Sequence, residues 1–227
     1  MPLPAPDAAR LFTLGTRYDC GRGMTATVTG LPQAELRLST GQVAACDPFI
    51  GLGDDADPFT VAVAPGSYPV VTSVVRITRA DFPAAVDSRV AAAWLRVSAE
   101  PTVAWELALG DGQRLDALEE AEFYGYGVDA GTGCFVDAAA STALGDFLGE
   151  EYELLNDALF GNEVPEPVGP VALTDPASGH NVVAFASGWG DGCYPTWLGR
   201  DADGRVTGYL TEFFVVPQPG RGPVDEE

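Results

Sequence analysis

The sequence predicts an α+β fold that is mostly β, either an antiparallel β-sandwich or an open barrel-like sheet with one or two short helices. Short apolar runs rich in Val, Thr and aromatic residues recur between clusters of Gly, Pro and Asp, which is typical of strands and turns. Helical spacing of apolar residues is concentrated in residues 138–160. With 46% hydrophobic and 20% charged residues, the 227-residue chain has enough apolar surface for one packed core.

The apolar runs predict the strands in chain order. They span residues 24–29, 42–46, 59–64, 68–78, 89–97, 102–109, 132–136, 182–186, 194–199 and 205–216. Pro101 forces a turn between two of these runs, so residues 97–103 are predicted to connect a hairpin. Residues 198–205 are predicted to form a second hairpin loop, with Gly204 at the position that favours a positive φ.

Helices are predicted in three places. Asp137 precedes the helical residues 138–144 and is expected to cap their N-terminus. In residues 151–160, apolar side chains recur at helical spacing between acidic ones. A short helix is also predicted over residues 7–12.

The elements are predicted to form a single β-rich domain over residues 1–216, with a Pro-rich connector at 163–170 and a flexible acidic tail at 217–227. No stretch approaches the roughly 18 apolar residues that a membrane span needs. The first residues also lack the pattern of a signal peptide. The four cysteines form no CxxC pair, so free buried thiols and a cytoplasmic location are expected.

Several segments together resemble the domain of unknown function 4241 (DUF4241) family of bacterial proteins. They follow one another in order and cover most of residues 39–216: 39–49, 64–70, 89–94, 127–137, 187–196 and 199–204. Glu106 lies in a matching Trp-Glu pair, whereas Glu212 stands where the family pattern has Asp. The resemblance implies a shared fold and shared loops, and it implies no activity.

Two Gly-rich loops that carry aspartates, 129–137 and 188–194, form the best candidate site. Closely spaced glycines allow backbone amides to face a ligand, and carboxylates hold hard cations such as calcium, magnesium or manganese. The predicted metal ligands are Asp129, Asp137 and Asp191. The predicted ligand-binding residues are Asp47, Asp129, Gly131, Gly133, Asp137, Gly190, Asp191, Gly192 and Tyr194.

A structural explanation of the same loops stays open. Gly-Thr-Gly and Gly-Asp-Gly are ordinary turn sequences, Asp137 is expected to cap a helix, and Asp191 is able to brace its own loop.

The charge is concentrated in one block of the chain. The formal net charge is -21, and all 12 basic residues are arginines. Residues 97–199 hold 18 acidic residues and Arg114 alone, whereas residues 1–96 hold 9 acidic residues and 8 arginines. This charge disfavours nucleic acid and anionic membrane, so neither is predicted as a partner, and it predicts a surface whose helix-bearing side is negative.

Two functions from different classes follow, and whether the protein is an enzyme stays open. The first is an acidic binding module that caps a basic protein partner, as immunity proteins cap cationic toxins. The alternative is a metal-dependent hydrolase or a small-ligand binder that uses the two Gly/Asp loops and a divalent cation. Acidity that serves solubility alone is the third explanation of the charge.

Overall fold

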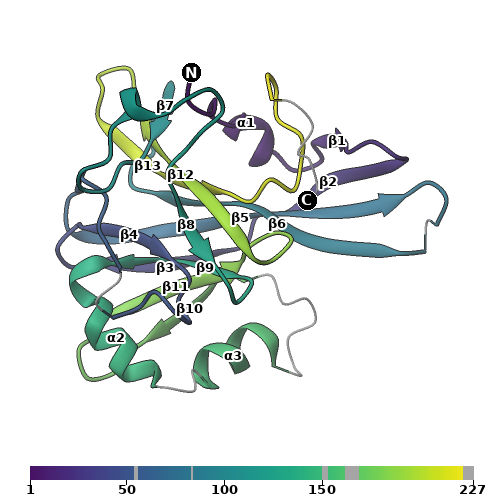
Figure 1. The fold of residues 1–227 in the computed structure, drawn as a ribbon. Coiled ribbons are helices and arrows are strands. Elements are labelled where there is room, and N and C mark those ends of the chain that lie inside the picture. The colour runs from purple at the N-terminus through teal and green to yellow at the C-terminus, as the bar shows by residue number, and fades with distance from the viewer. Residues whose placement is uncertain (54–55, 83, 150–152, 162–168, 222–227) are drawn as a thin grey trace.

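Two antiparallel sheets and a layer of helices make up the fold (Figure 1). The computed structural model describes all residues except 54–55, 83, 150–152, 162–168 and 222–227. The chain is 41% strand and 12% helix, which confirms the mostly β prediction. The predicted positions of the helix start at 151–152 and of most of the Pro-rich connector lie outside the described residues.

In the described part of the chain, the large sheet has nine strands, and two of its longer strands each pair with three others. Its path runs through β1 (Arg17–Asp19), β2 (Met24–Gly30), β5 (Gly66–Arg79), β6 (Val86–Arg96), β13 (Val206–Glu212), β12 (Gly192–Arg200) and β7 (Ala104–Leu107). Off this path, β3 (Gln33–Leu38) pairs with the first half of β5, and β8 (Gly125–Val128) pairs with the first half of β12. Each long strand therefore supports two short ones that lie end to end.

The small sheet has four strands in the described part of the chain. Its order is β10 (Val171–Thr174), β11 (Asn181–Ala186), β9 (Thr132–Asp137) and β4 (Val43–Cys46). Of these, β4, β9 and β11 are buried on both faces. Successive side chains of a strand point to opposite faces. In β9, Phe135 therefore packs into the core shared with the large sheet, whereas Cys134 and Val136 pack into a second core beneath the helices.

Helices cover the outer face of the small sheet (Figure 1). A 3-10 turn, η2 (Ala138–Ala140), leads into α2 (Ser141–Leu148), and α3 (Glu153–Phe160) follows. Leu144, Leu155 and Leu159 of these helices are fully buried against the sheet. The short α1 (Ala8–Leu11) packs on the large sheet instead, and η1 (Leu115–Ala117) lies in the connection between β7 and β8.

Two local predictions are wrong. Residues 59–64 form no strand, because their N–H groups donate to carbonyls in three different segments: Phe59 to Val43, Thr60 to Leu109, and Val63 to Gly41. Residues 97–103 do not connect a hairpin, because β6 pairs with β13 and β7 pairs with β12. The predicted hairpin at residues 198–205 is confirmed as the β12–β13 connection.

The ends of the domain are packed against it where the structure describes them. Within the expected tail, residues 217–221 fold back onto the large sheet, and Gln218 is buried. The predicted strand over 205–216 ends at Glu212, and Phe214 then turns the chain with a φ of 53°. Among the described helices, none combines the length and the apolar character needed to cross a membrane.

Candidate functional site

The two Gly/Asp loops lie side by side where the sheets are connected. Residues 129–131 join β8 to β9, and residues 187–191 join β11 to β12. Because Thr132 of β9 pairs with Ala186 of β11, both loops leave the small sheet at the same point. The Ser187 N–H donates to the Gly131 carbonyl at 3.0 Å. The structure thus brings the two loops together.

The three carboxylates predicted to hold a metal do not come together. Asp129 and Asp191 are exposed, each in its own loop, whereas Asp137 lies at the far end of β9. A strand rises about 3.3 Å per residue, so the two ends of β9 are roughly 16 Å apart, and one ion with bonds of about 2.3–2.6 Å does not bridge them. Within the described part of the chain, no three His, Cys, Asp or Glu side chains are arranged to hold a metal ion.

Asp137 is a buried helix cap whose oxygens are all in use. One oxygen accepts from the Ser39 hydroxyl at 3.1 Å and the Thr40 N–H at 2.6 Å. The other accepts from the Thr40 hydroxyl at 2.5 Å and the Ala139 N–H at 3.2 Å. Burial by itself would raise the pKa of Asp137, but these hydrogen bonds outweigh it and the pKa is lowered. The predicted cap is confirmed.

Asp47 holds the loop of residues 129–131 in place through hydrogen bonds. Its side chain is 1% exposed, and one carboxylate oxygen accepts from the Asp129 N–H at 3.0 Å and the Ala130 N–H at 2.8 Å. The other oxygen accepts from the Phe49 N–H at 2.9 Å. Asp47 therefore ties the end of β4 to the loop between β8 and β9.

We expect Asp47→Ala to lower the free energy of unfolding by about 3 kcal/mol, because the Asp129 and Ala130 N–H groups of the loop lose a charged acceptor. Urea denaturation followed by tryptophan fluorescence measures the loss. Asp129→Ala is the matched control, since Asp129 is exposed in the same loop and its removal should change stability little. Equal losses in the two variants would show that Asp47 does not brace the loop.

The remaining predicted ligand-binding residues shape and anchor the loops. Gly131 and Gly190 have φ values of 61° and 115°, which favour glycine at both turns. A Cβ on Gly133 would meet the Tyr126 hydroxyl at 2.5 Å, so this glycine permits close packing. Gly192 begins β12 beside the buried Tyr194, whose hydroxyl donates to the Gly190 carbonyl at 2.8 Å. Burial raises the pKa of Tyr194 to about 12, and the residue serves as an uncharged anchor.

A pocket of about 420 Å³ lies next to this braced loop, and Asp47 is part of its wall. Its volume falls within the range of about 300–1,000 Å³ that is typical of small-molecule sites. The wall combines the end of β4, residues 57–59, the connection after β7, strand β8 and one residue of β12. Its lining residues are Ala45, Cys46, Asp47, Ile50, Gly51, Asp57, Phe59, Ala108, Gly110, Gln113, Tyr124, Gly125, Tyr126, Gly127 and Thr196.

Internal hydrogen bonds hold the aromatic and polar walls of the pocket in place. The Tyr124 hydroxyl donates to the Arg114 carbonyl at 3.1 Å, and the Gln113 side-chain oxygen accepts from the Gly110 N–H at 2.8 Å. The Phe59 ring stacks on Tyr209 with centroids 5.2 Å apart. The pocket walls are therefore formed before any ligand arrives.

Two thiols meet behind the β4 side of the pocket. Cys46 and Cys134 are direct partners in the β4–β9 ladder, and their sulfur atoms are 3.5 Å apart. Both are free and buried, as expected for structural thiols, and burial raises the pKa of Cys134. Cys20 is partly exposed and Cys193 is exposed, contrary to a uniform pattern of buried thiols.

Most of the pocket is not recognisable in the sequence. The sequence predicts Phe59 within a strand, and Gln113, Tyr124 and Tyr126 belong to no motif. The available signal was Asp47 itself, which follows a predicted strand and belongs to the segment 39–49 that carries the family resemblance.

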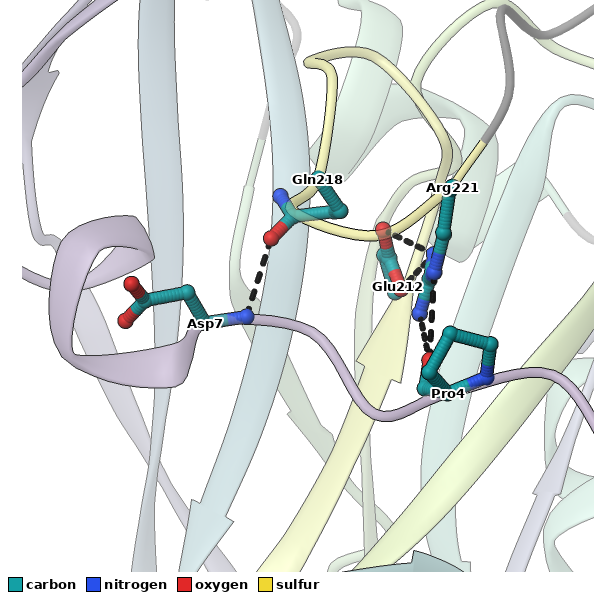
Figure 2. A network of polar contacts seen from close by, with 5 residues as sticks. All are labelled: Pro4, Asp7, Glu212, Gln218 and Arg221. Atoms are coloured by element: carbon teal, nitrogen blue, oxygen red, sulfur yellow. Dashed lines mark hydrogen bonds and ion pairs between the residues drawn. The ribbon is translucent and has the colours of Figure 1, made fainter.

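A second group of charged side chains lies at the ends of the chain (Figure 2). Both carboxylate oxygens of Glu212 accept from Arg221 at 2.8 Å, and Arg221 also donates to the Pro4 carbonyl. The Gln218 side-chain oxygen accepts from the Asp7 N–H at 2.9 Å. Burial raises the pKa of Glu212 to about 7, although the Arg221 charge opposes the rise. We call these five residues the terminal clasp, because they join both ends to β13.

Comparison with known proteins gives one match. Residues 36–211 match the model of a family described as a protein of unknown function (DUF4241). No curated protein and no solved structure matches the chain. The pocket lies wholly within the matched span, whereas the terminal clasp lies outside it.

Proposed function

The chain belongs to the DUF4241 family, to which no function is assigned, and from this premise we propose that it is a module that binds a basic protein partner. The proposal rests on the exposed carboxylates of residues 111–122, which we call the acidic loop. Its five acidic side chains are all exposed: Asp111, Asp116, Glu119, Glu120 and Glu122.

Little positive charge opposes the acidic loop. Its only basic residue is Arg114, which pairs with Asp116 at 2.5 Å. Among the described residues, no ion pair involves the other four carboxylates of the loop. Exposed charges of one sign speed association with a partner of the opposite sign and give binding a steep salt dependence.

Several arginines lie in the N-terminal strands and not in the acidic part of the sequence. Arg17, Arg76, Arg79 and Arg89 belong to β1, β5 and β6, which lie above α2 and α3 in Figure 1. The acidic residues of the 97–199 block that the structure describes are exposed, except Asp137 and Asp175. A partner with a basic face is therefore attracted to these carboxylates, and nucleic acid and anionic membranes are disfavoured.

The proposal includes a bacterial cytoplasmic setting. Four free cysteines, two of them in contact, are typical of a reducing compartment.

The test compares two variants that lose the same number and kind of charges. The loop variant carries Asp111→Asn, Asp116→Asn, Glu119→Gln and Glu120→Gln. The control variant carries Asp146→Asn, Asp157→Asn, Glu100→Gln and Glu153→Gln, all of which are exposed outside the loop. Each immobilised protein is incubated with bacterial lysate at about 50 mM and about 500 mM NaCl, and retained proteins are identified by mass spectrometry.

We expect the native protein and the control variant to retain the same basic protein at low salt and to release it at high salt. The loop variant should bind that protein at least about tenfold more weakly when the purified pair is measured by calorimetry. Retention of no basic protein at low salt, or equal weakening in both variants, would contradict the proposal.

The alternative of a small-ligand binder is favoured by the pocket, whereas its metal-dependent version has no assembled ligand set among the described residues. The second candidate function is therefore the binding of a small ligand in this pocket.

A further inference from the structure

We infer that the pocket beside Asp47 binds an organic cation, with an ammonium or guanidinium group as its recognised part. This inference deepens the proposed function, because a lysine or arginine side chain of a basic partner carries the same group. A free small amine carries it as well, and the experiment below separates the two sources.

The charge of the lining selects against anions. The charged lining residues are Asp47 and Asp57, and no Arg or His is among them. Asp57 is exposed, and no described cation forms an ion pair with it. Asp47 accepts three backbone N–H groups and contributes negative charge from within the wall. An anionic ligand would face two carboxylates without a counter-ion, whereas a cation gains from both.

The aromatic lining favours a cation over a neutral polar group. Phe59, Tyr124 and Tyr126 line the same pocket. The face of an aromatic ring attracts ammonium and guanidinium groups within about 6 Å of its centroid, and the attraction grows when water is excluded. This protein already uses such contacts elsewhere, as in Arg96, whose guanidinium carbon is 4.0 Å from the centroid of Trp94.

The position of the pocket links it to the proposed partner surface. Gly110, Gln113 and Tyr124 belong both to the pocket wall and to the segment that contains the acidic loop. The Tyr124 hydroxyl holds the backbone of Arg114 within that loop. A cation drawn to the acidic loop therefore meets the mouth of a pocket with aromatic and acidic walls.

The experiment titrates the full-length protein with benzylammonium, benzyl alcohol and benzoate, which share a ring and differ in charge. Calorimetry gives the affinity, and backbone amide shifts in a ¹H–¹⁵N spectrum give the location, with Gly110, Gly125 and Gly127 as reporters in the pocket wall. We expect benzylammonium to bind at least about tenfold more tightly than benzoate and to move these three amides.

Two variants test the assignment of the site. Asp57→Asn should weaken benzylammonium binding about tenfold, and Tyr124→Leu should weaken it severalfold. Asp157→Asn removes an exposed charge of α3, outside the acidic loop and outside the pocket lining, and it should leave the affinity within about twofold. Equal binding of benzoate, shifts confined to other residues, or equal effects of Asp57→Asn and Asp157→Asn would each overturn the inference.

Capped arginine and capped lysine distinguish the two sources of the cation. Binding of either at the reporter glycines with an affinity like that of benzylammonium assigns the pocket to a side chain of a protein partner. Binding of benzylammonium alone assigns it to a free amine. If the probes bind but no basic protein is retained in the lysate experiment, the proposed function fails while the pocket assignment stands.

Discussion

Arg221→Met is expected to lower the free energy of unfolding by about 3–5 kcal/mol at pH 8, because it leaves the Glu212 carboxylate buried without its partner. The side chains of Arg221 and Glu212 are 9% and 2% exposed, so water does not replace the lost contact. Arg221 also lies over Trp197 and Phe214, which adds packing to the loss. Urea denaturation at fixed pH measures the change.

The pH dependence of the stability of Arg221→Met shows whether the unpaired Glu212 carboxylate causes the destabilisation. Since the folded pKa of Glu212 is raised from 4.5 to about 7, its carboxyl contributes most to stability below pH 4.5, and this contribution is lost as the pH rises through 7. Removing the Arg221 charge should raise that pKa further, so Arg221→Met should cost much less at pH 5 than at pH 8. A loss of equal size at both pH values would point to packing alone.

Two controls accompany the clasp prediction. Combining Arg221→Met with Glu212→Gln should remove most of the difference between pH 5 and pH 8, because no buried carboxyl remains to titrate. Arg114→Met removes an arginine from an ion pair whose two side chains are 72% and 67% exposed, and it should leave stability unchanged.

Gly41→Ala is expected to lower the free energy of unfolding by about 3–4 kcal/mol, the second large effect. Gly41 has a φ of +81°, and a Cβ at this position would overlap the backbone carbonyl of Val63. The two residues lie this close because the Val63 N–H donates to the Gly41 carbonyl at 2.9 Å. This hydrogen bond holds residues 59–63 beside the start of β4. Because Phe59 of that segment lines the pocket, the variant should also bind benzylammonium more weakly.

Gly15→Ala is the matched control for this prediction. Gly15 has nearly the same φ, +82°, but a Cβ there would have nothing within 4 Å. Its replacement should cost about 1 kcal/mol, which is the conformational penalty alone. If the two alanine variants are equally unstable by urea denaturation, the close approach of Val63 does not matter.

The strands that the sequence predicted are those with strong β patterns, and the missed ones depend on their partners. β3 contains Gln, Ala, Glu, Leu and Arg, which favour helix when isolated. It becomes a strand because it pairs with β5 over its whole length, and this places Leu36 and Leu38 in the core. The short strands β1, β8 and β10 likewise exist beside longer neighbours.

The incorrect hairpin at residues 97–103 has a related cause. Pro101 does create a turn, as its residue type predicts, but a turn does not decide which strands pair. The β6 edge is occupied by β13, which arrives from more than a hundred residues later in the chain and brings β12 and β7 with it.

In the candidate site, too, the sequence predicts the local turns, whereas the tertiary structure decides which residues come together. Glycine spacing predicted two turns, and the β9–β11 pairing brings them together. The residue types and the glycine-rich loops predict the three aspartate ligands, whereas the structure separates Asp137 from the other two along the length of β9. Asp47 was predicted to bind a ligand, and its three N–H donors show that it supports the pocket wall.

The sequence by itself determined the mostly β class, the strongest strands, the cap at Asp137 and the concentration of negative charge after residue 97. These properties follow from residue type, local spacing and composition, which act over a few neighbours. Only the tertiary structure decided the strand order, the burial of Glu212 with Arg221, and the pocket formed by Asp57, Gln113 and Tyr124. Strand pairing and burial depend on groups far apart in the chain, and their free energy is gained only when the whole domain is assembled.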